Sequence, residues 1–92
     1  MQVEIISPEA KLLQIEADSI YVPGINGDFE MLNNHAPIVS LLKKGTIKIK
    51  GSFEIEELHQ DKFTKGDNNY THLEIASGTI EMSSNKIIIL VD

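Results

Sequence analysis

Short runs of alternating apolar and polar residues, interrupted by turn residues, repeat along nearly the whole chain. Residues 46–50 place Ile47 and Ile49 on one face and two lysines on the other, and residues 70–76 alternate in the same way. Because side chains of a β-strand alternate between two faces, this period of two predicts strands that are buried on one side. No stretch sustains helical spacing, so we expect no helix longer than one turn. The pattern predicts an all-β fold, either an antiparallel sandwich or a flattened barrel.

A change of phase divides residues 11–22 into two pieces. Leu13, Ile15 and Ala17 alternate on odd positions. After Asp18 the apolar side chains occupy even positions, beginning with Ile20. A strand that changes its apolar positions in this way contains a bulge or a bend. We expect the bend to carry the chain from one sheet of a sandwich to the other, and the alternative is two separate strands with a kink at Asp18.

The last two alternating runs, residues 79–82 and 86–91, predict a β-hairpin. A two-residue turn at residues 84–85 pairs Met82 with Ile87, so that apolar side chains share the buried face.

The middle of the chain is less regular. Residues 53–57 alternate and predict a further strand. If this strand pairs with the preceding one, Ile49 must oppose Ile55 for both patterns to agree, which requires an odd-length or bulged loop. The polar residues 58–69 follow, and we expect an exposed loop or a ragged extension of the hairpin, in which Phe63 is either a local anchor or exposed.

Two predicted strands carry apolar residues on faces that a simple sandwich leaves in water. Residues 38–42 are apolar on both faces apart from Ser40, and the last strand adds two apolar residues on its outer face. A strand that is apolar on both faces is covered on both sides, and large apolar patches on small domains usually mark protein contacts. We therefore predict four partner-facing side chains, namely Ile38, Leu42, Ile88 and Leu90.

The composition of the chain argues against several classes of function. The 92 residues form one domain, residues 1–92, with an extended loop or hairpin at about residues 51–69. The net charge of −6, with eight lysines and no arginine, argues against nucleic-acid binding and phosphoryl transfer. There is no cysteine, and the three histidines lack metal-ligand spacing, so we expect no metal and no cofactor. No apolar run approaches the roughly 20 residues that cross a membrane.

Turn residues are concentrated in residues 22–37, which read VPGINGDFEMLNNHAP. Such loop segments on a rigid strand scaffold commonly carry binding functions. Asp28 and Glu30 stand two apart, and paired carboxylates can perform acid–base chemistry. A solvated or partner-facing acidic strand edge explains the same two residues without catalysis. His35 could stabilise a turn, lie at an interface or be inert.

Three segments in order carry a family resemblance: VEIISPEAKLL, then VPGINGDFEMLNNHAPIVSLLKKGTIKI, then LEIASGTIEMSSNKIIIL. Within them, Gly27-Asp28-Phe29, His35-Ala36-Pro37, Lys44-Gly45 before an alternating strand, and Ser77-Gly78 before the last hairpin stand in the family's order. The chain resembles the N-terminal β-sandwich domain of the epsilon subunit of rotary F-type ATP synthase. The resemblance covers nearly the whole chain except roughly residues 51–69.

The resemblance implies a flattened antiparallel sandwich of about ten short strands without a catalytic site of its own. It implies a rotor subunit of the central stalk that links the gamma subunit to the c-ring and couples ATP synthesis or hydrolysis to proton or sodium transport. Matched by position, Asp28, Glu30 and His35 would face the c-ring. The protein would be peripheral, on the cytoplasmic face of the bacterial inner membrane, with membrane contact only through the c-ring.

The sequence departs from the family in two respects. The family often continues into two C-terminal helices, and this sequence ends at Asp92, so we expect either a short form or a truncated chain. The second departure is local: residues 51–69 are longer than the family pattern, Asn33-Asn34 stands where Pro-Gly is expected, and Thr79 stands where a second glycine is expected. Two other functions stay open: a free-standing β-sandwich adaptor or ligand-binding domain with no rotary role, and a small hydrolase that uses Asp28 and Glu30.

Overall fold

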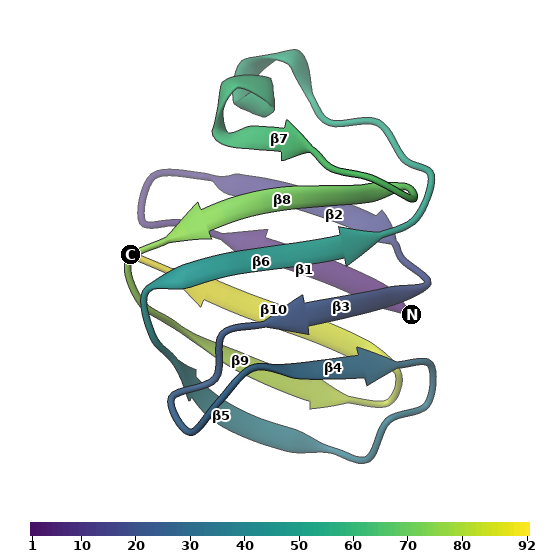
Figure 1. Cartoon of the computed structure of the whole chain (residues 1–92), viewed down its shortest axis with the longest axis vertical. Coiled ribbons are helices and arrows are strands. Elements are labelled where there is room, and N and C mark those ends of the chain that lie inside the picture. The colour runs from purple at the N-terminus through teal and green to yellow at the C-terminus, as the bar shows by residue number, and fades with distance from the viewer.

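The computed structural model describes residues 1–92 and consists of two five-stranded β-sheets packed face to face (Figure 1). Sheet A has the strand order β2-β1-β10-β9-β5, and sheet B has the order β4-β3-β6-β8-β7. The strands of sheet A are β1 (Gln2–Ile6), β2 (Lys11–Glu16), β5 (Ile38–Leu42), β9 (Gly78–Ser83) and β10 (Lys86–Val91). The strands of sheet B are β3 (Ser19–Val22), β4 (Phe29–Leu32), β6 (Gly45–Lys50), β7 (Phe63–Lys65) and β8 (Tyr70–Ile75). The predicted sandwich of about ten short strands is confirmed.

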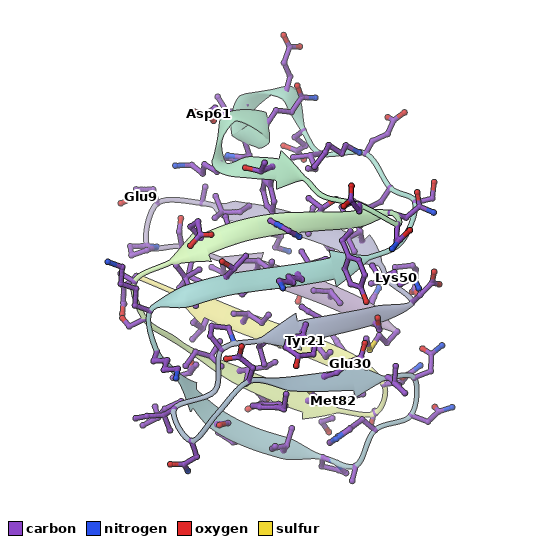
Figure 2. All side chains as sticks on the ribbon, viewed as in Figure 1. Glu9, Tyr21, Glu30, Lys50, Asp61 and Met82 are labelled. Atoms are coloured by element: carbon purple, nitrogen blue, oxygen red, sulfur yellow. The ribbon has the colours of Figure 1, made fainter.

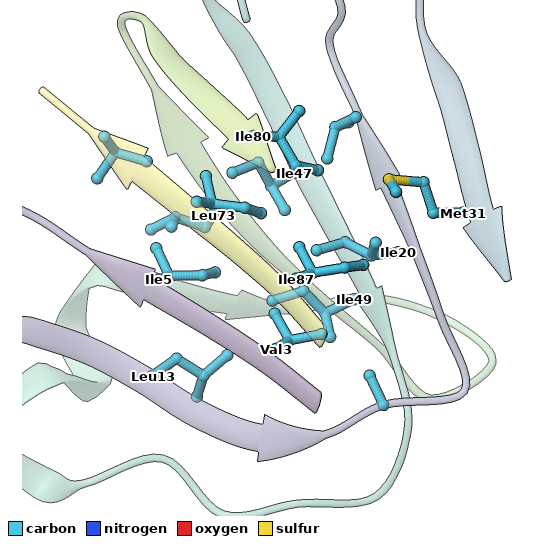
Figure 3. Close-up of a cluster of buried hydrophobic side chains, with 14 of the residues drawn as sticks. Val3, Ile5, Leu13, Ile20, Met31, Ile47, Ile49, Leu73, Ile80 and Ile87 are labelled. Atoms are coloured by element: carbon cyan, nitrogen blue, oxygen red, sulfur yellow. The ribbon is translucent and has the colours of Figure 1, made fainter. Parts of the chain in front are cut away.

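The hydrophobic core fills the space between the two sheets (Figure 3). Val3 and Ile5 of β1, Ile87 of β10, and Ile47 and Ile49 of β6 all belong to this core and are fully buried. These side chains are β-branched, a type that packs well on a pleated surface. Each contributes roughly 1.5–3 kcal/mol by leaving water, so the inward faces of β1, β6 and β10 supply much of the stability.

Two sequence predictions about connections are confirmed. β2 belongs to sheet A and β3 to sheet B, so the chain changes sheets at the phase break near Asp18. β9 and β10 form a hairpin in which Met82 pairs with Ile87. Ser84 and Asn85 form its turn, and both have positive φ angles, of 51° and 59°, as the favoured two-residue hairpin turns require.

One strand pair was not expected. β1 and β10 lie side by side in parallel, with Val3 opposite Ile87 and Ile5 opposite Ile89, while every other pair of strands is antiparallel. Apolar alternation is the same for either strand direction, so the sequence pattern does not distinguish the two.

The prediction for residues 53–57 is wrong. These residues form no strand, and β6 pairs instead with β8, with Ile47 opposite Leu73. The prediction of no helix longer than one turn is also wrong, because a six-residue 3-10 helix, η1 (Glu57–Lys62), follows. β7 then adds an edge to sheet B beside β8. Residues 51–69 thus form an extended segment, a short helix and an edge strand.

Candidate protein-contact surfaces

β5 is the outer strand of sheet A, and it turns one face to the core and the other to solvent. Leu42 is only 4% exposed and Ile38 packs against the core, whereas Val39 is 74% exposed and Leu41 is more than half exposed. The sequence prediction therefore named the inward residues of this strand, and Val39 and Leu41 are the outward ones. The error arose because IVSLL is apolar in both phases, so the period of two does not identify its buried face.

The outward side chains of β5 belong to a larger apolar patch on the outer face of sheet A. In one row across the sheet, Thr79 of β9 lies between Leu41 of β5 and Leu90 of β10. In the neighbouring row, Glu81 of β9 lies between Val39 of β5 and Ile88 of β10. Leu90 is more than half exposed and Ile88 is partly exposed, as predicted for an outward face. We define the apolar patch by its five hydrophobic residues, Ile25, Val39, Leu41, Ile88 and Leu90.

Ile25 reaches this patch from a loop of the other sheet. It belongs to the β3–β4 loop, and its backbone N–H donates to the Leu41 carbonyl at 3.1 Å. Ile25, Leu41 and Leu90 together line a shallow hollow of about 420 Å³. An apolar hollow of this kind, open to solvent, is the type of feature into which a partner's side chain can pack.

A charged cluster occupies the same outer face beyond the patch. The carboxylate of Glu4 lies 3.0 Å from Lys11 Nζ and 3.4 Å from Lys86 Nζ, and Lys11 also donates to Gln14 Oε1 at 3.1 Å. The hydrogen bond from Lys11, assisted by Lys86, holds the pKa of the Glu4 carboxyl below its ordinary value, although burial acts in the opposite direction. The outer face of sheet A thus has an apolar part and a charged part. Sequence reasoning missed this cluster because its three members meet only through strand pairing.

The β3–β4 loop, residues 23–28, closes the edge between the two sheets. It leaves sheet B and contacts β5 of sheet A, since Gly24 bridges Leu42 and Lys43 N–H donates to the Pro23 carbonyl at 2.9 Å. Gly24 is required here because a Cβ at this position would lie 2.6 Å from the Gly27 carbonyl oxygen and 2.7 Å from the Phe29 ring. Gly27 has a φ of 125°, which only glycine adopts readily.

The three residues that the resemblance assigns to a c-ring interface are all exposed, but they do not form one cluster. Asp28 ends the β3–β4 loop, Glu30 lies on β4, and His35 lies in the loop after β4. Asp28 and His35 are therefore separated by the length of β4, roughly 13 Å for four residues. His35 Nδ1 is 2.7 Å from the carbonyl oxygen of its neighbour Ala36.

The second turn region, after β4, is held by contacts with distant segments. The backbone N–H of Asn34 donates to Asn85 Oδ1 at 2.8 Å, so this loop is fixed to the β9–β10 turn. Asn33 Oδ1 accepts a hydrogen bond from the Met1 amino group at 2.6 Å. The turn-rich stretch that begins at Val22 therefore runs along the β4–β5 edge and is attached to sheet A at both ends.

The paired-carboxylate chemistry has no geometric support. Asp28 lines a shallow hollow of about 450 Å³ on the outer face of sheet B, and Glu30 does not line it. Glu30 lies instead opposite Tyr21 on the neighbouring strand (Figure 2). No three histidine, cysteine or acidic side chains are grouped so as to hold a metal ion. The helix content is the single short 3-10 helix, which is too short to cross a membrane.

The remaining face, the outer side of sheet B, carries polar and aromatic side chains. Lys48 Nζ lies 5.8 Å from the centre of the Tyr21 ring, and Lys50 Nζ lies 5.7 Å from that of Tyr70. Thr46 Oγ1 donates to Glu74 Oε1 at 2.5 Å on the same face. These pairs satisfy one another locally, as expected for a solvated face. Fold and surface together define a small β-sandwich domain with an apolar patch on one outer face.

Comparison with known proteins identifies the family of this β-sandwich. The family described as ATP synthase, Delta/Epsilon chain, beta-sandwich domain matches residues 1–92, and the chain belongs to this family. The ATP synthase epsilon chain of Chlorobaculum tepidum is 32% identical over 89 residues, which cover 97% of this chain and 85% of that relative. The epsilon chain of Leptospira borgpetersenii is 35% identical over 92 residues, 100% of this chain and 61% of the relative. That of Desulfitobacterium hafniense is 33% identical over 88 residues, 96% of this chain and 55% of the relative.

The chain thus spans little more than half the length of the Leptospira and Desulfitobacterium relatives. Among solved structures, a chain of the Tetrahymena thermophila mitochondrial ATP synthase central stalk and c-ring matches with a TM-score of 0.75. It is 16% identical, and the match covers 98% of this chain and 61% of that one. At this identity the likeness concerns the fold.

Proposed function

We propose that this domain is a non-catalytic rotor subunit of an F-type ATP synthase that links the gamma subunit to the c-ring. It couples ATP synthesis or hydrolysis to proton or sodium transport by transmitting torque between these two partners. It is a peripheral protein on the cytoplasmic face of the bacterial inner membrane and reaches the membrane only through the c-ring. Membership of the delta/epsilon family and the names of the relatives support this proposal.

The observation that carries the proposal is the apolar patch of sheet A. Four of its five hydrophobic residues point outward from β5 and β10, the two strands that flank β9, and the fifth, Ile25, reaches the patch from the β3–β4 loop. All but Ile88 are more than half exposed. Exposed apolar patches on small soluble domains usually mark protein contacts. We assign this patch, with the neighbouring Glu4 cluster as its polar margin, to the gamma subunit. Ile88 and Leu90 keep the partner-facing role predicted from the sequence, and Val39 and Leu41 replace Ile38 and Leu42.

The c-ring contact is assigned to the β3–β4 loop around Asp28. Asp28 is exposed at the end of a loop whose backbone is bonded to β5, so the loop that carries Asp28 has a defined place on the sandwich. Glu30 and His35 extend the same edge of the sandwich, with His35 at the far end of β4. A polar loop of the ring would meet these side chains along the β4 edge.

Single substitutions at the two surfaces test the proposal separately. Leu41→Lys places a charge in the apolar patch and should weaken gamma binding at least about tenfold, which corresponds to about 1.4 kcal/mol. Asp28→Lys reverses a charge at the loop and should reduce ATP-driven ion pumping several-fold while leaving gamma binding unchanged. The measurements are gamma affinity of the purified domain and pumping by the reconstituted complex.

Thr64→Lys provides the matched control, since Thr64 is exposed on β7, away from both surfaces. Circular dichroism should show that all three variants are folded. If Leu41→Lys binds gamma like the unmodified domain and Asp28→Lys pumps normally, the rotor proposal is wrong, and a free-standing adaptor becomes the better description.

A further inference from the structure

Asn26 stands directly before Gly27 in the β3–β4 loop, and it is the only one of the six asparagines that a glycine follows. Both residues are exposed. A Cβ placed on Gly27 would have no heavy atom within 4 Å, so the space around this residue is open. The Asn26–Gly27 peptide therefore lies in open space at the surface of the loop.

We propose that the Asn26–Gly27 peptide is a site of spontaneous deamidation. The backbone nitrogen of Gly27, after losing its proton, attacks Cγ of the Asn26 side chain. A five-membered succinimide forms as the side-chain nitrogen leaves as ammonia. Water then opens the ring at one of its two carbonyls, giving aspartate or isoaspartate. The balance is one water consumed and one ammonia released, with no oxidant or second reactant.

Glycine is what distinguishes this site from the other asparagines. A side chain on the following residue crowds the approach of the backbone nitrogen to Cγ, and glycine has no side chain. Asn33, Asn34, Asn68 and Asn69 are also exposed, but the residues that follow them are asparagine, histidine, asparagine and tyrosine. All five asparagines are therefore exposed, but only Asn26 is followed by glycine.

One contact opposes the reaction. The Gly27 N–H donates to the Gly24 carbonyl at 3.0 Å, and this hydrogen bond closes the turn. The reacting nitrogen must leave that bond before it can attack Cγ. The turn is at the surface, where local opening costs little free energy compared with global unfolding. The reaction thus proceeds from an opened loop.

The products change the loop in two ways. Either product adds a negative charge beside Asp28, and isoaspartate also lengthens the backbone by one carbon. The longer backbone cannot keep the Gly24–Gly27 turn, which is so tight that a Cβ on Gly24 would lie 2.6 Å from the Gly27 carbonyl oxygen and 2.7 Å from the Phe29 ring. Ile25 lies in the same turn, so its contact with Leu41 is disturbed. The effect on ring and gamma contacts rests on the proposed function, whereas the reaction itself does not.

The test is ageing of the purified full chain in mildly alkaline and mildly acidic buffer, followed by digestion at low pH and peptide mass mapping. Deamidation raises a peptide's mass by one dalton, and an isoaspartate methyltransferase assay detects the second product. We expect the Asn26 peptide to convert several-fold faster than the peptides of the four other exposed asparagines, and faster in alkali, because the attacking nitrogen must be deprotonated. Conversion no faster than at Asn33 or Asn69 would overturn the proposal.

Two variants complete the design. Asn26→Gln should suppress conversion, because the longer side chain disfavours ring closure, and undiminished conversion at this position would contradict the mechanism. Asn26→Asp carries the charge of the aspartate product with a normal backbone, so comparison with aged protein separates the effect of charge from that of isoaspartate. Mass mapping reads the reaction without gamma or the c-ring, so failure here and failure of the rotor proposal are distinguishable.

Discussion

At the scale of single residues, Glu4 is the carboxylate that forms ion pairs with two lysines and whose pKa is lowered by them. It is 7% exposed and carries two lysine ammonium groups on its two carboxylate oxygens. A carboxyl whose pKa is lower in the folded chain than in the unfolded chain stabilises the fold above its ordinary pKa of 4.5. This stabilisation is lost as the pH falls through the lowered folded value.

We predict that Glu4→Gln lowers the free energy of unfolding near neutral pH and that the difference from the unmodified chain shrinks below about pH 4.5. Glutamine keeps the shape of the side chain but not its charge. Urea unfolding between neutral and acidic pH measures the difference. Glu81→Gln is the control, because Glu81 is exposed on the same outer face and makes no ion pair. A Glu4→Gln difference that does not vary with pH would contradict the prediction.

Single residues also show where the sequence pattern is enough to predict which side chains are buried. Alternation correctly placed Ile47 and Ile49 in the core, because their neighbours are polar and only one phase is possible. Ile87 was placed there by its predicted pairing with Met82 across the hairpin turn. Alternation failed for β5, where Leu41 and Leu42 are equally apolar and only the structure shows which one faces inward. The Glu4 cluster could not be predicted because its members come from three strands and meet only through pairing.

At the scale of elements, the segment before β8 shows the limit of local patterns. Residues 53–57 alternate like a strand, yet β6 pairs with β8, whose paired residues lie 20 to 30 positions further along the chain. Phe53 and Ile55 nevertheless pack against the core, so their apolar character was correctly associated with burial but not with a strand. Pairing is decided by which strand completes the sheet, and that choice depends on contacts far apart in the sequence.

Phe63 provides the prediction at this scale. It opens β7, lies opposite Leu73 of β8 and packs partly buried against the core, so of the two predicted roles the structure selects the local anchor. Phe63→Ala should lower the free energy of unfolding by about 1–3 kcal/mol, below the range for a fully buried phenylalanine. Leu58 of η1 is 80% exposed, and Leu58→Ala should change the same quantity by less than about 0.5 kcal/mol.

Urea titrations of both variants provide the measurement, with equal slopes required for the comparison. A loss at Leu58 as large as that at Phe63 would mean that η1, rather than β7, anchors the segment.

At the scale of the whole molecule, the turn-rich stretch from Val22 to Pro37 joins two surfaces rather than forming one. Its first loop places Ile25 in the apolar patch of sheet A, and Asp28 lines a hollow on the outer face of sheet B. The sequence identified this stretch as a contact region but could not show that it wraps the β4–β5 edge. That arrangement depends on the bridge between Gly24 and Leu42, which joins the two sheets.

If the apolar patch binds gamma, binding must stabilise the whole domain, because gamma binds the folded chain and not the unfolded one. At a free gamma concentration of about 100 times Kd, the stabilisation is about 2.7 kcal/mol, which slows exchange of amides that open only by global unfolding about 100-fold. Hydrogen exchange with mass spectrometry measures these exchange rates separately for each chain within the complex.

We expect the slowed exchange in the unmodified domain and in Thr64→Lys, and we expect it to be lost in Leu41→Lys at the same gamma concentration. Equal slowing in all three would place the gamma contact elsewhere on the molecule. Slowing confined to peptides of β5 and β10 would show that gamma protects only its own footprint, without the global stabilisation that tight binding to the folded state requires.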